Sequence, residues 1–231
     1  MELIAEIGQN HNGDMVLAKK LIRLAKQSGA DVAKFQLFCA KTLFKKENNP
    51  WYEYNLNTEL NKSSVEMLME YSDKVGIEFM ASVFDEERIS WMEELGVKRY
   101  KIASRSINDK RLIDAVLKTK KPTIISLGHW KDDKLPDFKG NIQGYLYCIS
   151  KYPTPIEDIN FSKISFDNYL GFSDHTIGIA ASCVAVSRGS KVIEKHFTLD
   201  KNLYGPDHQG SALPKEFIEL RKFSDQARRC L

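Results

Sequence analysis

Gly171-Phe-Ser-Asp-His175-Thr and Glu194-Lys-His196-Phe-Thr are two polar clusters, and each follows directly on a short apolar run. The apolar runs predict two short buried strands. A stretch with helical periodicity separates the two histidines, which are 21 residues apart. Because a strand–helix–strand order is typical of neighbouring parallel strands, we expect both histidines at the same end of one sheet.

The same order of elements recurs along the whole chain. Short apolar, β-branched runs predict eight strands, at residues 3–7, 32–37, 78–83, 99–103, 122–127, 144–149, 170–172 and 191–195. Segments with helical periodicity lie between them, at residues 15–30, 64–75, 86–95, 111–117, 177–186 and 214–227. This alternation predicts a (β/α)8 TIM barrel of the α/β class, with residues 1–231 forming a single domain. A doubly wound open sheet is the structural alternative. It is disfavoured because residues 8–13 lack the GxGxxG order of a nucleotide loop.

Length and composition restrict the class of protein further. A chain of 231 residues is close to the roughly 250 that one barrel needs. The 34 basic and 31 acidic residues give a net charge of +3, which indicates neither a nucleic-acid partner nor an anionic membrane. The four cysteines are scattered, as expected of structural thiols in a reducing compartment. With no basic leader and no span-length apolar segment, the sequence predicts a cytoplasmic protein.

One insertion interrupts the regular pattern. Residues 39–63 are long, polar and aromatic, and they include Trp51-Tyr-Glu-Tyr54. We expect them to form an extended loop over the mouth of the barrel, after the second strand.

Polar side chains follow nearly every predicted strand. Each has an ordinary alternative: a strand lysine often points outward, a strand-end serine is often a helix cap, and a histidine is often structural. Since the carboxyl ends of barrel strands meet in one place, however, these residues would be buried together, at a cost of several kcal/mol if they had no role. The sequence therefore predicts a site at that end of the barrel.

The chemistry of these residues falls into three sets. Two cations and several hydroxyls could surround a phosphate group: Lys34, Lys101, Ser82, Ser104, Ser126 and Ser173. His175 and His196 could bind a divalent metal and leave positions for water and substrate, with Asp174 or Glu194 either orienting a histidine or facing a helix. Glu6, Tyr152 and Asp207 could hold sugar hydroxyls or move a proton.

Seven motifs in order resemble the sialic acid (N-acetylneuraminate) synthase family. They lie within residues 2–216 and begin at Ala5-Glu-Ile-Gly-Gln-Asn-His, Gly29-Ala-Asp-Val-Ala-Lys-Phe-Gln, Tyr100-Lys-Ile-Ala-Ser, Tyr152-Pro-Thr-Pro, Gly171-Phe-Ser-Asp-His-Thr, Glu194-Lys-His-Phe-Thr and Gly205-Pro-Asp-His. The resemblance implies a TIM barrel that condenses phosphoenolpyruvate with an N-acyl hexosamine-type aldehyde, such as N-acetylmannosamine. The products would be a nonulosonic acid and phosphate. It also implies a homodimer.

The resemblance implies a role for each candidate residue. His175 and His196 match ligands of Mn²⁺ or Mg²⁺, and the lysine–serine set matches the positions that bind phosphoenolpyruvate. Glu6, Tyr152 and Asp207 match residues that hold the sugar, with Lys101 beside them among the catalytic positions.

The sequence departs from the family pattern at two positions. Ser106 stands where many members have a glutamate that reaches the metal-bound water, and Ser150 stands where an asparagine is expected among the substrate contacts. The family's small antifreeze-like domain, which supplies an arginine to the partner's sugar site, has no counterpart in these residues. The candidates to replace that contact are Lys45, Lys46, Arg105 and His208.

Two other functions remain open at this point. One is a related condensation of phosphoenolpyruvate that gives a shorter 3-deoxy-2-ulosonate. The other is a non-catalytic barrel that binds a sugar or phosphate, or that regulates a longer homologue. Retention of both histidines and both lysines favours an enzyme, whereas Ser106 and the missing domain favour the non-catalytic alternative.

Overall fold

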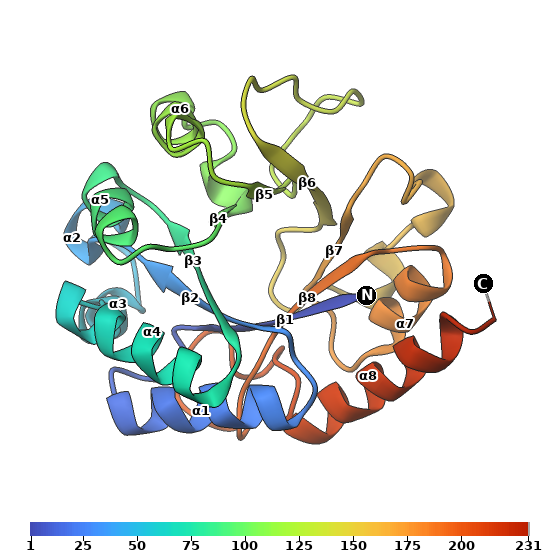
Figure 1. The fold of residues 1–231 in the computed structure, drawn as a ribbon, viewed down its shortest axis with the longest axis horizontal. Helices are drawn as coiled ribbons and strands as arrows, with labels where there is room; N and C mark the ends of the chain where they lie inside the picture. The colour runs from blue at the N-terminus through green and yellow to red at the C-terminus, as the bar shows by residue number, and fades with distance from the viewer. Residues whose placement is uncertain (231) are drawn as a thin grey trace.

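The chain folds into a closed barrel of eight parallel strands in sequence order, which confirms the predicted TIM barrel (Figure 1). The structure is a computed structural model and describes residues 1–230; Leu231, the last residue of the predicted domain, lies outside the described residues. The strands are β1 (Glu2–Gly8), β2 (Val32–Leu37), β3 (Glu78–Val83), β4 (Tyr100–Ile102), β5 (Thr123–Ser126), β6 (Ile142–Cys148), β7 (Gly171–Asp174) and β8 (Val192–His196).

Six helices cover the outside of the barrel close to where the periodicity predicts them. They are α1 (Met15–Gln27), α4 (Lys62–Val75), α5 (Glu86–Glu94), α6 (Lys110–Lys118), α7 (Ala180–Ser187) and α8 (Pro214–Ala227). The Asp14 carboxylate caps α1 by accepting from the backbone N–H groups of Val16 and Leu17. α7 begins three residues later than predicted, because Gly178 has a positive φ of 77° and ends the loop before it.

Two connections between strands contain no α-helix, so the expected strict alternation is wrong there. Residues 127–141, between β5 and β6, form a loop that contains Pro136 and Gly140. The connection from β6 to β7 has only two short 3-10 turns, η2 (Ile156–Asp158) and η3 (Phe161–Lys163). Proline and glycine both disfavour a helix interior, and no helical periodicity was visible in either segment.

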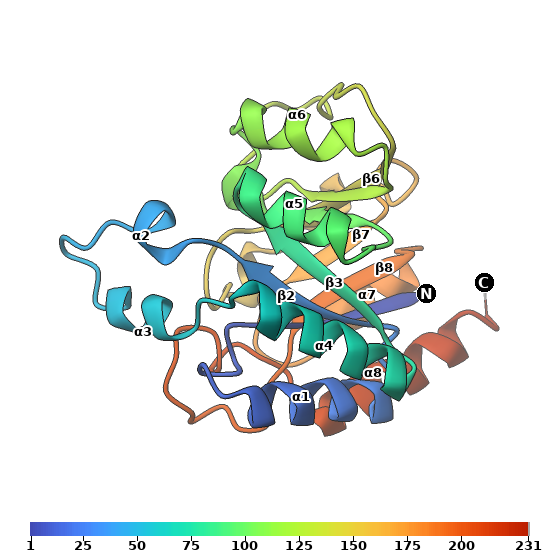
Figure 2. The same cartoon turned by 60° about the vertical axis from the view of Figure 1, so that its left-hand side comes forward.

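The predicted insertion after β2 forms two short helices, α2 (Ala40–Leu43) and α3 (Tyr52–Asn57). Figure 2 shows both helices projecting beyond the carboxyl end of β2, on one side of the barrel mouth. The expectation of an extended loop at the mouth is therefore correct.

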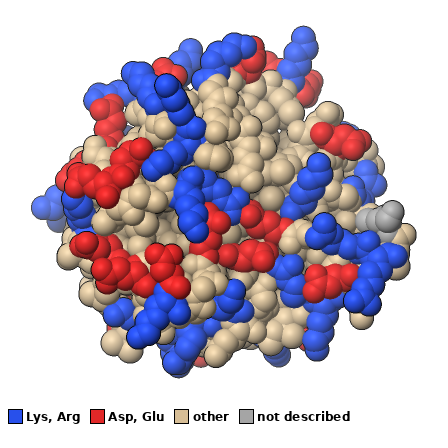
Figure 3. All heavy atoms as spheres, viewed as in Figure 1, with Lys and Arg blue, Asp and Glu red and all other residues tan. Residues whose placement is uncertain are grey.

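Inward-facing side chains fill the barrel in three layers. At the amino end of the strands, Arg99 forms ion pairs of 2.6 and 2.7 Å with Glu2 and Glu78. Figure 3, which looks onto this end, shows acidic and basic side chains intermingled near its centre. The middle layer is apolar and fully or almost fully buried: Ile4, Val32, Met80, Ile124, Leu146 and Val192. The third layer, at the carboxyl end, is polar.

A second and larger apolar core lies between the sheet and the surrounding helices. It contains the outward-facing residues of the strands, such as Phe35 and Phe172, together with the inner faces of the helices, such as Leu21 and Phe217. Across residues 1–230, none of the helices combines the length and apolar character needed to cross a membrane.

Candidate functional site

The polar layer at the carboxyl end of the barrel lines a narrow inner cavity of about 50 Å³. Strand register aligns its members, since Glu6 pairs with Lys34, Ser82 with Lys101, and Ser173 with Glu194. Ten of the twelve predicted site residues line this cavity: Glu6, Lys34, Ser82, Lys101, Ser104, Ser126, Tyr152, Ser173, His175 and His196. The structure thus brings them together, and their individual roles stay predictions.

Lys34 is a buried cation held between two carboxylates. Its ammonium lies 2.7 Å from Glu6 Oε2 and 3.4 Å from Glu194 Oε2, and it donates to the Ser82 hydroxyl at 3.1 Å. Burial acts to lower the pKa of Lys34, but Glu194 and Glu6 outweigh it and raise the pKa above its ordinary value. Lys34 is therefore charged, and its charge is largely balanced.

Lys101 is equally buried but has no close carboxylate. Its ammonium donates to the Ser126 hydroxyl at 2.7 Å and to the Ile102 carbonyl at 3.2 Å. The nearest carboxylate oxygen in the described part of the chain, Glu194 Oε1, is 3.6 Å away. Burial lowers the pKa of Lys101, Glu194 opposes this, and repulsion from Lys34 adds to it. An anion entering the cavity would find in Lys101 an incompletely paired cation.

Both lysines and all three strand-end serines face the interior, so the outward-pointing and helix-capping alternatives are wrong. Ser82 and Ser126 hydrogen-bond the lysines, and Ser173 donates to Glu194 Oε1 at 2.8 Å. The helix after β3 is capped by a different residue, Asp85.

The two carboxylates considered as partners of the histidines have different positions. Asp174 faces away from the cavity, where it accepts from Ser182 and pairs with Lys195 at 3.1 Å behind the sheet. Glu194 faces the cavity, between the two lysines. Burial acts to raise its pKa, but Lys101, Lys34 and Ser173 outweigh it, so the pKa lies below its ordinary value. Neither carboxylate hydrogen-bonds a histidine. Of the two alternatives, Asp174 takes the one in which it faces a helix, because it accepts from Ser182 on α7, whereas Glu194 takes neither.

The two predicted metal ligands lie close together at the junction of the inner and outer pockets. Their ring centres are 5.7 Å apart. His175 Nδ1 lies 2.7 Å from the Ile149 carbonyl, which can only accept, so Nδ1 carries a proton and, in the neutral imidazole, the Nε2 lone pair is available to a metal. His196 Nδ1 is buried without a hydrogen-bond partner. A backbone-anchored imidazole and an orphaned ring nitrogen are what a two-histidine metal site requires. Within residues 1–230, no group of three or more His, Cys, Asp or Glu is placed to hold a metal, so other ligands would come from water and substrate.

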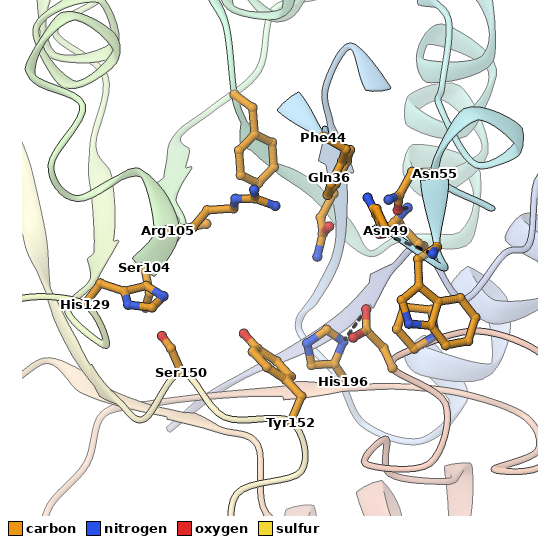
Figure 4. A pocket seen from close by; sticks show the side chains of 16 residues that line it. Gln36, Phe44, Asn49, Asn55, Ser104, Arg105, His129, Ser150, Tyr152 and His196 are labelled. Carbon is orange, nitrogen blue, oxygen red and sulfur yellow. Dashed lines mark hydrogen bonds and ion pairs between the residues drawn. The ribbon is translucent and has the colours of Figure 1, made fainter. Parts of the chain in front are cut away.

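An outer pocket of about 450 Å³ opens above the inner cavity and shares Ser104, Tyr152 and His196 with it (Figure 4). The other two predicted residues, Ser150 and Asp207, line this pocket. Asp207 Oδ2 lies 3.9 Å from His196 Nδ1, and the Ser150 hydroxyl is buried without a partner. The insertion contributes one wall of the pocket through Phe44, Asn49, Trp51 and Asn55.

Tyr152 lies between the two pockets. Its ring packs on His175 with ring centres 4.1 Å apart and meets the edge of His196 at 5.9 Å. In Figure 4 its hydroxyl points into the outer pocket. The tyrosine thereby fixes one side of both imidazoles and presents a hydroxyl to whatever binds above them.

The four residues proposed to contact the sugar differ in whether they line the outer pocket. Arg105 lines the outer pocket, whereas Lys45 and Lys46 do not. His208 is fully buried and bonds Thr198 and Asn12, so its expected role in the site is wrong. Ser106, the position of the expected glutamate, is buried and lines neither pocket.

Gln36, a polar strand residue that was given no role, and Cys148, which was expected to be only a structural thiol, also line the inner cavity. Gln36 donates to Glu6 Oε1 at 2.8 Å, and the buried Cys148 thiol lies 3.8 Å from His175 Nδ1 and contacts Ser104 at 3.3 Å. Cys148 is therefore part of the site as well as a buried thiol. Side chains two residues apart on a strand face the same side. This rule points to both residues, because Gln36 follows Lys34 by two and Cys148 precedes Ser150 by two.

Comparison with known proteins agrees with this geometry. The NeuB family pattern matches residues 21–231. An uncharacterized protein of Methanocaldococcus jannaschii is 41% identical over 94% of this chain and 68% of its own length. The N,N'-diacetyllegionaminic acid synthase of Legionella pneumophila is 39% identical over 94% of this chain and 69% of its own.

A solved structure shares the same fold. The N-acetylneuraminic acid (sialic acid) synthetase of Leptospira borgpetersenii superposes with a TM-score of 0.91 at 32% identity, over 99% of this chain and 84% of that one. The two synthases among them are named for different acids, legionaminic and neuraminic, so they indicate the class of reaction and leave the acceptor open. The chain belongs to the NeuB family of sugar-acid synthases and is an enzyme.

Proposed function

We propose that this enzyme condenses phosphoenolpyruvate with an N-acyl hexosamine-type aldehyde, such as N-acetylmannosamine, in a reaction that depends on Mn²⁺ or Mg²⁺. One water molecule is consumed: it adds to the phosphate-bearing carbon after the carbon–carbon bond has formed. Collapse of that adduct breaks the C–O bond to phosphate, which gives a nonulosonic acid and inorganic phosphate. Family membership supports the use of phosphoenolpyruvate and a sugar, while the choice of acceptor and the need for metal are our inference. A homodimer remains a prediction.

One observation carries the proposal: Lys101 is a buried ammonium whose hydrogen-bond partners are the neutral oxygens of Ser126 and Ile102. Its one carboxylate neighbour, Glu194, lies 3.6 Å away and is shared with Lys34. A buried cation that is only partly balanced is costly, and an anionic substrate would supply a closer partner. Lys34 lies in the same cavity, and serine hydroxyls surround both lysines. Phosphoenolpyruvate, with a phosphate and a carboxylate, fits two adjacent cations.

The residues of the chain then have distinct tasks. Lys34 and Lys101 bind the two anionic groups, and Ser82, Ser104, Ser126 and Ser173 donate to or accept from the groups around them. These contacts hold the enol carbon at a fixed position and stabilise negative charge on the departing phosphate. Glu194, ionised between the lysines, keeps the cavity from being strongly positive in the absence of substrate.

The acceptor sugar would occupy the outer pocket. Tyr152, Ser150 and Asp207 line it with hydroxyl and carboxylate groups that can bond sugar hydroxyls. Glu6 lines the inner cavity below this pocket and is linked to it through Gln36, which lines both and donates to Glu6 Oε1. A divalent ion held by His175 and His196 would polarise the aldehyde oxygen and favour attack by the enol carbon.

Two alternatives make different predictions. A synthase of shorter 3-deoxy-2-ulosonates would use small aldehydes that leave the outer pocket of about 450 Å³ mostly empty. A non-catalytic barrel would bind phosphoenolpyruvate or sugar without turnover, consistent with Ser106 in place of a glutamate. Enzyme family membership disfavours the second alternative.

The decisive experiment measures phosphate release from phosphoenolpyruvate with Mn²⁺ and a panel of aldoses and N-acyl hexosamines. We expect release with at least one N-acyl hexosamine and little with C3–C5 aldehydes. Release only with small aldehydes would replace the proposed acceptor, and binding without any release would overturn the proposed reaction.

The metal assignment has a separate test. We expect chelation by EDTA to stop phosphate release and added Mn²⁺ to restore it. His175→Ala combined with His196→Ala should abolish both the activity and the Mn²⁺-dependent rise in melting temperature. Full activity of the double variant would show that the two histidines do not hold the metal.

A further inference from the structure

Arg105 is a cation in the outer pocket with no acidic partner. It lies in the short 3-10 turn η1 (Ser104–Ser106) after β4, and its guanidinium packs on the Phe44 ring at 4.9 Å. Figure 4 shows the side chain extending into the pocket. Across residues 1–230, no carboxylate lies within 4.0 Å of the Arg105 guanidinium nitrogens.

The two buried arginines of the barrel, Arg88 and Arg99, are both paired with carboxylates, whereas Arg105 is exposed to the pocket. Arg88 contacts Glu59 at 3.0 Å, and Arg99 contacts two carboxylates at the opposite end of the barrel. Partial burial lowers the pKa of Arg105 from its ordinary value, and Tyr152 opposes this shift. A guanidinium remains charged under all ordinary conditions, so an unpaired one in a pocket can still gain a counter-ion.

The charges of the outer pocket are arranged asymmetrically. Asp207 is the acidic residue among those that line it, and it lies beside His196. In Figure 4, Arg105 and His129 lie on one side of the pocket and His196 on the other. Neutral donors, Gln36 and Asn49, line the same space as Arg105. The pocket is thus acidic near the histidines and basic across from them.

The turn after β4 directs Arg105, rather than Ser106, into this pocket. Ser106 is buried outside both pockets, so a cation occupies the part of this turn that reaches the substrate space. The Phe44 ring restrains the guanidinium plane, which reduces the entropy lost when its two-pronged face binds a planar or tetrahedral anion.

We propose that Arg105 selects an acceptor sugar that carries an anionic substituent, a phosphate or a carboxylate, at the end remote from its aldehyde. This inference rests on the proposed function, since it places the aldehyde at His175 and His196. The remote end of the sugar then faces Arg105 across the pocket, and the volume of about 450 Å³ accommodates a substituted hexose.

Three acceptors with one skeleton test this inference: N-acetylmannosamine, its 6-phosphate and its 6-carboxylate. Steady-state rates with saturating phosphoenolpyruvate and Mn²⁺ give KM and kcat for each. We expect one anionic sugar to have a KM at least tenfold below that of the neutral sugar, and its identity distinguishes phosphate from carboxylate. Arg105→Ala should raise that KM at least tenfold, leave kcat within about twofold, and change the KM of the neutral sugar far less. Arg105→Lys should restore part of the preference.

The matched control is Lys46→Ala, which removes a cation from the insertion. Lys46 packs over the Tyr52 ring and does not line the pocket, so its loss should leave all three KM values unchanged. Equal KM values for the three sugars in the wild-type enzyme would overturn the proposal. So would an Arg105→Ala variant that loses affinity for the neutral sugar equally, or that raises the KM for phosphoenolpyruvate instead.

Calorimetric titration of the same sugars separates this inference from the proposed function. Tighter binding of an anionic sugar that disappears in Arg105→Ala supports the role of Arg105 even if no phosphate is released. Absence of phosphate release with every acceptor would overturn the proposed reaction alone.

Discussion

The barrel carries a charged cluster at each end, and β4 and the residue before it contribute a cation to both. Arg99, at the amino end, forms ion pairs with Glu2 and Glu78 and hydrogen-bonds Gln143. Lys101, at the carboxyl end, has two neutral partners and a carboxylate at 3.6 Å. The two side chains are two residues apart and both face the interior, with the apolar layer between the clusters.

The difference distinguishes a structural ion cluster from a binding site. At the amino end, the guanidinium nitrogens of Arg99 all have acceptors. At the carboxyl end, two buried polar atoms of the site, Ser150 Oγ and His196 Nδ1, lack a hydrogen-bond partner. Unsatisfied buried atoms cost stability, and a bound ligand can recover that cost. A substitution at the amino end should therefore lower the stability and spare substrate binding. A substitution at the carboxyl end should weaken substrate binding and spare the stability.

The largest effect should follow from Lys101→Met. Because this side chain offers charge to the substrate, we expect kcat/KM for phosphoenolpyruvate to fall by about 100-fold or more. The melting temperature should change little, since Glu194 keeps Lys34 as a partner. Phosphate-release kinetics and a thermal melt measure the two quantities. An inactive variant that is also unfolded would not support a role in binding, so both must be measured on one preparation.

Arg99→Met should produce the reverse pattern. It leaves Glu2 and Glu78 without their cation, and we expect a loss of about 3 kcal/mol in the free energy of unfolding, the low end for a broken buried pair. The low end applies because these carboxylates are 25% and 23% exposed. The KM for phosphoenolpyruvate should stay within about twofold of the wild-type value. Adding Glu2→Gln and Glu78→Gln should recover most of the stability, and failure to recover it would contradict the pairing argument.

His11 lies at the carboxyl end of the barrel, yet we expect it to affect stability and not substrate binding. It is fully buried in the loop after β1, and burial lowers its pKa to about 4, with Asp14 opposing. Its imidazole accepts from the Gly13 N–H. Because the unfolded chain protonates His11 near pH 6.5, the folded state loses about 2 kcal/mol of stability as the pH falls from 7 to 4.5.

Urea unfolding across this pH range measures the slope, and His11→Gln should flatten it. Other buried histidines titrate as well, so the comparison is between the slopes of the two proteins. An unchanged slope in His11→Gln would show that His11 does not have the lowered pKa. Activity at pH 7 should be retained in the variant, because His11 lines neither pocket.

The smallest effect should come from Ser126→Ala. This change removes the hydroxyl that accepts from Lys101 at 2.7 Å. We expect about a tenfold rise in the KM for phosphoenolpyruvate, equivalent to about 1.4 kcal/mol. Ser187→Ala, which removes an exposed hydroxyl bonded to the Cys183 carbonyl on α7, is the matched control. A KM equal to that of the control would remove Ser126 from the binding site.

The sequence predicted most of this architecture because strand and helix periods are local signals. The strand-end clusters at His175 and His196 placed the site at the correct end of the barrel. The sequence-based predictions did not decide whether Asp174 and Glu194 face the barrel interior or the surrounding helices. For Glu194 they could have done so, because residues two apart on a strand face the same side and Glu194 precedes His196 by two. Arg105 was one of four candidates, and only the turn after β4 distinguishes it from His208. Such turns and long loops depend on tertiary packing, which residue periodicity does not encode.

The apolar layer of Ile4, Val32, Met80 and its neighbours also restricts the movement of substrates. It closes the barrel axis on one side of the inner cavity, and on the other side the cavity shares Ser104, Tyr152 and His196 with the outer pocket. Under the proposed function, phosphoenolpyruvate must arrive before the sugar, because a sugar seated above it blocks the passage. By the same argument, the sugar acid leaves the outer pocket first, and phosphate then leaves the inner cavity. A barrel interior closed at one end thus sets the sequence of events in each turnover.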